Sequence, residues 1–242
     1  MNLIILYIIS FFATIAVLAT GYFINMNARN CFEKLKGFEN IKGINAKDFS
    51  YIFFRHNKLK NIELLTLRAK KTNYYSPKYN VIKISPEIVT STFLFDIAIC
   101  AKCANQAKKQ QCYYISATLR LIVSMLCNII SVLFVPTILI CAILNISLGL
   151  ERVALTISLI DIICYLLAFL TQIIFYLIDK SSTKHIVSDI QKLNLFEESE
   201  LKTLASLIET LNKFDFFSYT RLSIKIFSYL NPATFIDKNE NN

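Results

Sequence analysis

Three long apolar runs divide the chain, at residues 3–25, 121–150 and 153–178. Each exceeds the roughly 20 residues with which a helix crosses a bilayer core of about 30 Å. Because lipid offers no partners to backbone N–H and C=O groups, a single segment crosses it only as a helix. The pattern therefore predicts about three transmembrane helices, and the length of the runs argues against helices buried in a soluble core.

The first run has two readings, a cleaved signal peptide or an uncleaved anchor. Only Met1 and Asn2 precede it, so it lacks a basic leader, and no clear small-residue cleavage site follows. The sequence favours an uncleaved anchor.

The polar region between the first two runs carries signals for both helices and strands. Asn45 is a good N-cap, and Ser85-Pro86 is typical of a helix start. Alternating side chains indicate strands, and Tyr75-Ser76-Pro77-Lys78 reads as a turn. We expect helix 47–55, strands 61–68 and 79–84 in a β-hairpin, and helix 88–109.

Beyond the third run, apolar side chains recur at helical spacing in residues 186–195 and 198–214. Residues 216–230 are apolar but contain Arg221 and Lys225, so we expect them at the membrane interface or packed on the domain. The fold class expected is a mostly helical α+β membrane protein. Its expected parts are an anchor (1–25), a basic α+β domain (26–118), two spans (119–150 and 151–178) and a helical tail (179–242).

The distribution of charge predicts how the chain is oriented in the membrane. The chain has a net charge of +9, and residues 28–113 hold sixteen Lys and Arg against six Asp and Glu. The positive-inside rule then predicts a multi-pass cell-membrane protein whose N-terminus lies outside and whose basic domain and tail are cytoplasmic. The same charge could bind anionic lipid head groups or nucleic acid, although no specific nucleic-acid binding is predicted. The favoured interpretation is that the charge keeps this domain on the cytoplasmic side.

The cysteines and Asp161 are further candidates for a chemical role. The seven cysteines give no disulfide framework, and Cys100 and Cys103 could hold structural zinc only with distant ligands such as Cys31 or His56. Asp161 lies inside the third run, where a charge is costly. It is expected either to donate a hydrogen bond as a protonated group or to serve a proton or ion pathway.

The order of these elements resembles that of the bacterial membrane-bound neutral zinc metallopeptidases. The resemblance covers most of the chain and rests on several collinear segments. They are the helix at Asn45–Asn57, the turn and strand Tyr-Ser-Pro-Lys-Tyr-Asn-Val-Ile-Lys-Ile-Ser at 75–85, the helix at 95–107, Ile-Asp-Lys-Ser at 178–181, and residues 193–198. It implies a zincin-like domain and a zinc cofactor.

The family's chemistry uses His-Glu-x-x-His on a helix, where both histidines bind zinc and the glutamate is the general base. Ala101, Lys102 and Asn105 stand at those three positions, and Leu177 stands near the third ligand, a glutamate. Alanine and leucine have no lone pair to offer, and a lysine cation repels a metal dication. The sequence therefore predicts that no metal is held and no substrate is hydrolysed.

The sequence leaves three alternative functions open. The first is a non-catalytic pseudo-peptidase that binds or scaffolds a peptide or membrane-protein partner. It would pair the peptide with an edge strand at Tyr79, Val81 and Lys83. The second is an active peptidase whose metal is held by Cys103, Asn105 and Asp179. The third is an unrelated transporter-accessory subunit in which Asp161 matters.

Overall fold

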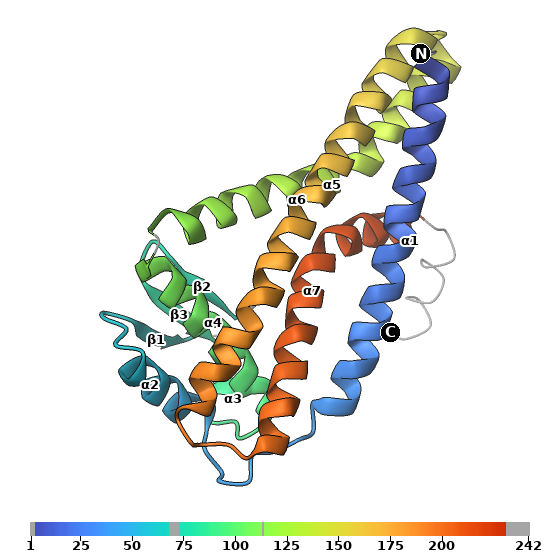
Figure 1. The fold of residues 1–242 in the computed structure, drawn as a ribbon. Helices are drawn as coiled ribbons and strands as arrows, with labels where there is room; N and C mark the ends of the chain where they lie inside the picture. The colour runs from blue at the N-terminus through green and yellow to red at the C-terminus, as the bar shows by residue number, and fades with distance from the viewer. Residues whose placement is uncertain (1–2, 68–72, 113, 231–242) are drawn as a thin grey trace, which may run out of the picture. The chain divides into compact units, whose positions relative to one another are not determined.

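The computed structural model describes residues 3–67, 73–112 and 114–230 (Figure 1). In this part of the chain seven helices accompany a three-stranded sheet. In chain order they are α1 (Leu3–Leu35), α2 (Ala46–His56), β1 (Glu63–Thr66), β2 (Tyr74–Ser76), β3 (Val81–Ile84), α3 (Pro86–Val89), α4 (Leu94–Cys112), α5 (Tyr114–Leu148), α6 (Glu151–Gln191) and α7 (Glu198–Leu230).

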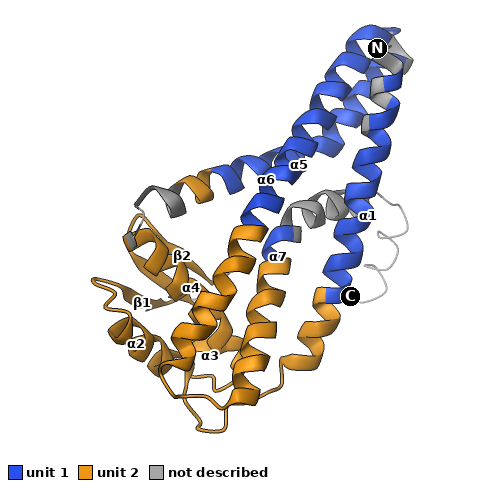
Figure 2. Cartoon of the chain, viewed as in Figure 1, with its two compact units in different colours: residues 1–27, 123–176, 214–242 blue, residues 28–122, 177–213 orange. Residues whose placement is uncertain are grey.

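The chain forms two compact units, each assembled from segments that are distant in sequence (Figure 2). The membrane unit contains residues 1–27, 123–176 and 214–242, and the α+β unit contains residues 28–122 and 177–213. Helices α1, α5, α6 and α7 each contribute residues to both units. Residues 177–213, which the sequence sets apart as part of a tail, therefore share a unit with the basic domain.

Three helices are long and apolar enough to cross a membrane, as expected: they span Phe11–Leu35, Leu119–Asn145 and Glu151–Gln191. Within the membrane unit, one series of buried and half-buried positions on each of α5 and α6 recurs at alternating intervals of three and four. On α5 it is Cys127, Ser131, Phe134, Ile138 and Cys141, and on α6 Ala154, Ser158, Asp161, Tyr165 and Ala168. This period of 3.5 residues is typical of helices packed side by side.

The same two helices are joined by a tight connection. Gly149 adopts φ +63°, and the Leu150 N–H donates to the Leu144 carbonyl at 3.3 Å. The left-handed conformation suits glycine and ends α5 abruptly. Phe134 and Tyr165 then stack with ring centroids 4.3 Å apart, so α5 and α6 form a packed antiparallel pair.

Helix α2 begins as predicted. The Asn45 side chain accepts a hydrogen bond from the Asp48 N–H at 2.8 Å, which satisfies one of the unpaired donors at the helix start. Phe49 and Phe53 are fully buried on one face of this helix. The Asn45 cap in the sequence therefore located the start of this helix.

The sheet differs from the predicted hairpin. Its strand order is β1-β3-β2, with β3 parallel to β1 and antiparallel to β2. The hairpin lies between β2 and β3, and the expected turn at Tyr75–Lys78 overlaps β2. Residues expected to be a turn therefore form the third strand, which lies inside the long connection that a parallel pair requires. Tyr75 is buried and donates a hydrogen bond from its hydroxyl to the Asn80 Oδ1 at 2.8 Å.

The helix predicted at 88–109 is interrupted. A single turn, α3, is followed by residues 90–93 and then by α4, and the Ser85 side chain makes no capping bond. The backbone carbonyls of the interrupting residues make hydrogen bonds outside a helix: those of Ser91 and Thr92 accept from the Ala46 and Asn40 N–H groups. These bonds to the 40–46 segment are incompatible with a continuous helix.

Two further boundaries differ because polar residues continue a helix that began in an apolar run. Helix α1 extends to Leu35, ten residues beyond the expected end of the anchor at residue 25. Helix α6 continues without a break to Gln191, so the expected separate helix at 186–195 is its last part. Residues 198–214 are helical as predicted, and α7 continues to Leu230.

Candidate functional site

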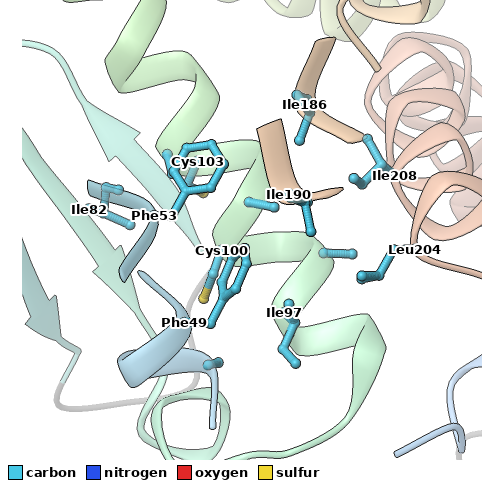
Figure 3. Packing of buried hydrophobic residues seen from close by; sticks show 14 of the residues in the cluster. Phe49, Phe53, Ile82, Ile97, Cys100, Cys103, Ile186, Ile190, Leu204 and Ile208 are labelled. Carbon is cyan, nitrogen blue, oxygen red and sulfur yellow. The ribbon is translucent and has the colours of Figure 1, made fainter. Parts of the chain in front are cut away.

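Helix α4 carries Ala101, Lys102 and Asn105, the residues that the sequence resemblance places at a metallopeptidase metal-binding motif, and it is enclosed on all sides. Every residue from Leu94 to Gln110 is buried or half-buried. On one side, Phe49, Phe53 and Ile82 from α2 and β3 lie against it, and on the other side lie Ile186, Ile190, Leu204 and Ile208 from α6 and α7 (Figure 3). These residues form one hydrophobic core around the helix.

The three motif positions have different environments. Ala101 is 0% exposed and belongs to this core, Asn105 is 8% exposed, and Lys102 is half-buried. Ala98, Ala104 and Ala107 are also fully buried, so small side chains allow neighbouring elements to approach α4 closely. The first ligand position is thus filled by close apolar packing, without an opening for a water molecule and a substrate.

The fourth position, which stands near the family's third metal ligand, has a different environment from the other three. Leu177 on α6 is 57% exposed, in contrast to the buried Ala101 and Asn105. Asp179, two residues later, is only 9% exposed, and its carboxylate faces cations. The acidic group nearest to the expected third ligand is therefore already engaged in ion pairs.

An ion-pair network around Asp179 connects four helices of the α+β unit. Both guanidinium nitrogens of Arg120 on α5 donate to its carboxylate, one of them at 2.5 Å, and the Lys109 ammonium on α4 lies 4.0 Å away. Asn212 on α7 donates to the Thr183 hydroxyl at 3.1 Å and to the Asp179 carbonyl at 3.4 Å. The bidentate geometry makes the Arg120 pair a strong, directional contact.

Burial sets the ionisation of two groups near this site. It lowers the pKa of Lys109, and this effect outweighs the opposing attraction of Asp179. Burial also raises the pKa of the Cys100 thiol to about 12, which keeps this cysteine protonated at neutral pH. A protonated, buried thiol is a poor metal ligand, because metals bind the thiolate.

The residues present do not fit zinc. Among the residues whose placement is described, no three His, Cys, Asp or Glu side chains form a group able to hold a metal ion. Cys103 is buried and Asp179 is paired with Arg120, while His56 and His185 are both exposed. The alternative ligand set of Cys103, Asn105 and Asp179 therefore has no support in the structure.

The raised thiol pKa predicts that Cys100 resists alkylation. At pH 8 only about 10⁻⁴ of a thiol with this pKa is ionised, against roughly a quarter for an ordinary cysteine, so labelling should slow by more than about 1,000-fold. Iodoacetamide labelling followed by peptide mass mapping measures this, with the denatured protein as the control. Equal rates for Cys100 in folded and denatured protein would contradict the buried environment.

The strand expected at the edge of the sheet is at its centre. β3 is hydrogen-bonded to β1 on one side and β2 on the other, so the prediction of an edge strand at residues 79–84 is wrong. Val81 is buried, Lys83 is half-buried, and Tyr79 precedes the strand in a turn. A peptide could pair with the backbone of β3 only by displacing a neighbouring strand.

Asp161 lies in the membrane unit, on the buried stripe of α6 between Ser158 and Tyr165. One carboxylate oxygen, Oδ2, is buried and has no hydrogen-bond partner among the described residues. The structure therefore places a polar group in the interior of this unit without supplying a donor to that oxygen.

Sequence reasoning missed the partners of Asp179. Arg120 lies next to the start of the second apolar run, and Asp179 directly follows the third run. Two antiparallel spans joined by a short link bring Arg120 and Asp179 to the same end of the helix pair. The opposite charges at the two run borders that lie away from the link could therefore have predicted this ion pair.

A comparison with protein families gives one match. The model of a family described as putative neutral zinc metallopeptidase matches residues 8–209. No curated protein and no solved structure matches the chain.

Proposed function

Because the chain belongs to this neutral zinc metallopeptidase family, we propose that it is a membrane-anchored, non-catalytic member that acts as a binding or scaffolding module. The single observation that carries the proposal is the fully buried Ala101 at the first metal-ligand position, inside an apolar core. An active enzyme of this kind needs an open coordination position at the metal for water and substrate.

The chemistry of the neighbouring positions supports the same conclusion. Lys102 replaces the general base by a cation, which cannot accept a proton from water while it is charged. Asn105 replaces an imidazole by a carboxamide, which is a weak zinc ligand. Hydrolysis by this family's mechanism requires all three functions together, so their joint loss removes the reaction while leaving the fold.

A hydrolysis assay tests the proposal. The purified full-length protein in detergent is incubated with a fluorescently quenched casein or peptide library, with added zinc or with a chelator. We expect no turnover above a heat-denatured sample in either condition. Chelator-sensitive cleavage that disappears in an Asn105→Ala variant would overturn the proposal and favour an active enzyme with unusual ligands.

A second candidate function is favoured by Asp161. A carboxyl group in a span usually faces a partner or a cavity, and Oδ2 of Asp161 lacks a hydrogen-bond partner in the part of the chain that the structure describes. The chain would then act as a subunit of a membrane assembly, with Asp161 contacting a donor on another membrane protein. This role is compatible with a scaffolding module.

Replacing Asp161 by Asn should then weaken a membrane partnership by about 5–10-fold, the effect of losing one interhelical polar contact. The measurement is quantitative recovery of cross-linked membrane partners from cells. The matched control is Asn128→Leu, which also removes a half-buried polar side chain from a span. If Asp161→Asn and the control behave alike, Asp161 has no partner-specific role.

A further inference from the structure

Several helix cations of the α+β unit are paired with acids, as in Lys108–Asp189 at 2.5 Å and Lys213–Glu209 at 3.1 Å. Around the sheet and at the end of α2, none of the described cations forms such a pair. Residues 55–67 and 73–83 hold five Lys and Arg against one acid, Glu63. We define the basic cluster as these five residues: Arg55, Lys58, Lys60, Lys78 and Lys83.

The members of the basic cluster carry no ion pair within the described part of the chain. Arg55, Lys58, Lys60 and Lys78 are exposed, and Lys83 is half-buried. Lys78 and Lys83 instead lie over aromatic rings, 5.2 Å from the Tyr79 centroid and 5.7 Å from the Tyr74 centroid. The positive charge is therefore left available to an external anion.

Hydrogen bonds hold part of this cluster together. The Asn80 side chain donates to the carbonyls of Lys60, at 3.2 Å, and of Asn61, so the segment before β1 is fixed beside the turn that carries Lys78. The Lys58 N–H donates to the Arg55 carbonyl at 3.2 Å. The charges thus gather where the parallel strands β1 and β3 begin.

A short tether connects the cluster to a candidate membrane span. Gln111 accepts from the Lys60 N–H at 3.2 Å and donates to the Lys60 carbonyl at 2.6 Å. Leu119, where the second span starts, is eight residues further on, and α5 is helical from Tyr114. With Gln111 and Cys112 in α4 and residues 114–119 in α5, the backbone from Gln111 to Leu119 spans at most about 18 Å.

This length is comparable with the distance over which a charged membrane surface attracts cations. The head-group layer adds about 5–8 Å to each side of the hydrocarbon core, and the field decays over about 8–10 Å at physiological salt. Exposed tyrosines accompany the lysines, Tyr79 at 63% and Tyr74 at 42%. Tyrosine and lysine together are typical of surfaces that lie at the lipid head groups.

From the unpaired charge, the tyrosines and the tether, we propose that the basic cluster docks on the anionic phospholipid head groups of the membrane that holds the spans. The lipid is favoured over a nucleic acid or an acidic protein because the tether keeps head groups constantly within reach. Docking would fix the orientation of the sheet at the membrane surface and is independent of any catalytic activity.

The chain contains no tryptophan, so a Tyr79→Trp variant provides a single fluorophore in the cluster. The full-length variant is placed in nanodiscs of phosphatidylcholine, alone or with roughly 30% phosphatidylserine. In the anionic discs at about 50 mM salt, we expect a blue-shifted emission and less quenching by acrylamide, both reversed at about 500 mM salt. No difference between the two lipids would overturn the proposal.

A charge-reversal set supplies the matched control. Each lysine near an anionic surface changes the ratio of docked to free protein about five-fold, so losing Lys58, Lys60 and Lys78 lowers it about 100-fold, and Lys58→Glu, Lys60→Glu and Lys78→Glu together should lower it by at least that factor. Lys47→Glu, Lys184→Glu and Lys202→Glu change the net charge equally at exposed positions outside the cluster. If both sets abolish the lipid response alike, net charge and not the cluster is responsible, which overturns the proposal.

Circular dichroism tests whether both triple variants are folded. If the cluster variant is not folded, single-lysine variants of the cluster replace it. A short RNA and a polyglutamate peptide are added to phosphatidylcholine discs as competing anions. A response of Trp at position 79 to either of them, without a response to phosphatidylserine, would assign the cluster to a different partner and overturn the lipid proposal.

Discussion

An Asp179→Asn variant should unfold at a temperature about 5–10 °C below that of the parent protein. The substitution keeps the size of the side chain but leaves Arg120 and Lys109 without their counter-charge in a mostly buried place. Removing one partner of a buried ion pair costs about 3–5 kcal/mol. Because the Arg120 side chain is 27% exposed, we reduce this to about 2–3 kcal/mol, and each kcal/mol shifts the midpoint of a chain this size by about 2–4 °C.

Circular dichroism in detergent measures this midpoint, and the chain supplies its own control. Glu198 pairs with Lys202 at 2.8 Å on the fully exposed side of α7, so Glu198→Gln should leave the midpoint unchanged. Combining Asp179→Leu with Arg120→Met removes both charges and should recover part of the loss. An Asp179→Asn midpoint equal to that of Glu198→Gln would mean that the network contributes nothing.

Restoring a histidine at the first ligand position should be destabilising. Ala101→His forces an imidazole into a fully occupied core and buries its nitrogen atoms without partners. Overpacking and unsatisfied polar atoms each cost about 1–3 kcal/mol, so the unfolding midpoint should fall by about 5–15 °C. Lys102→His, at the half-buried neighbouring position, should cost much less.

The response to zinc sharpens this prediction. Histidines four residues apart on a helix bind zinc when space is available on their shared face. In an Ala101→His, Asn105→His variant we expect added zinc to leave the lowered midpoint where it is, because the core leaves no room for the ion. A rise in the midpoint on adding equimolar zinc would show that the site can still open.

Local signals in the sequence located most elements but not their pairing. The three apolar runs and the Asn45 cap depend on nearby residues, and they were predicted correctly. The central position of β3 was not. Strand order depends on contacts between residues that are far apart in sequence, and a three-residue strand such as β2 is too short to show alternation.

For the candidate site, the sequence predicts which chemical groups are missing, and only the structure shows what fills their place. The replacement of the motif by Ala101, Lys102 and Asn105 is what the resemblance implies from the sequence alone. That Ala101 is enclosed between α2, β3, α6 and α7 is not, because residues 186–208 read as a tail separate from the basic domain. The pairing of Asp179 with Arg120 was hidden for the same reason, since it joins helices 59 positions apart.

The most direct measurement is the zinc content of the full-length protein purified without chelators and dialysed against zinc-free buffer, determined by inductively coupled plasma mass spectrometry. With Ala101 inside an apolar core and Asp179 bound by Arg120, we expect less than about 0.1 zinc ion per chain. About one tightly held ion per chain, lost on replacing Asn105 or Asp179, would contradict a non-catalytic site.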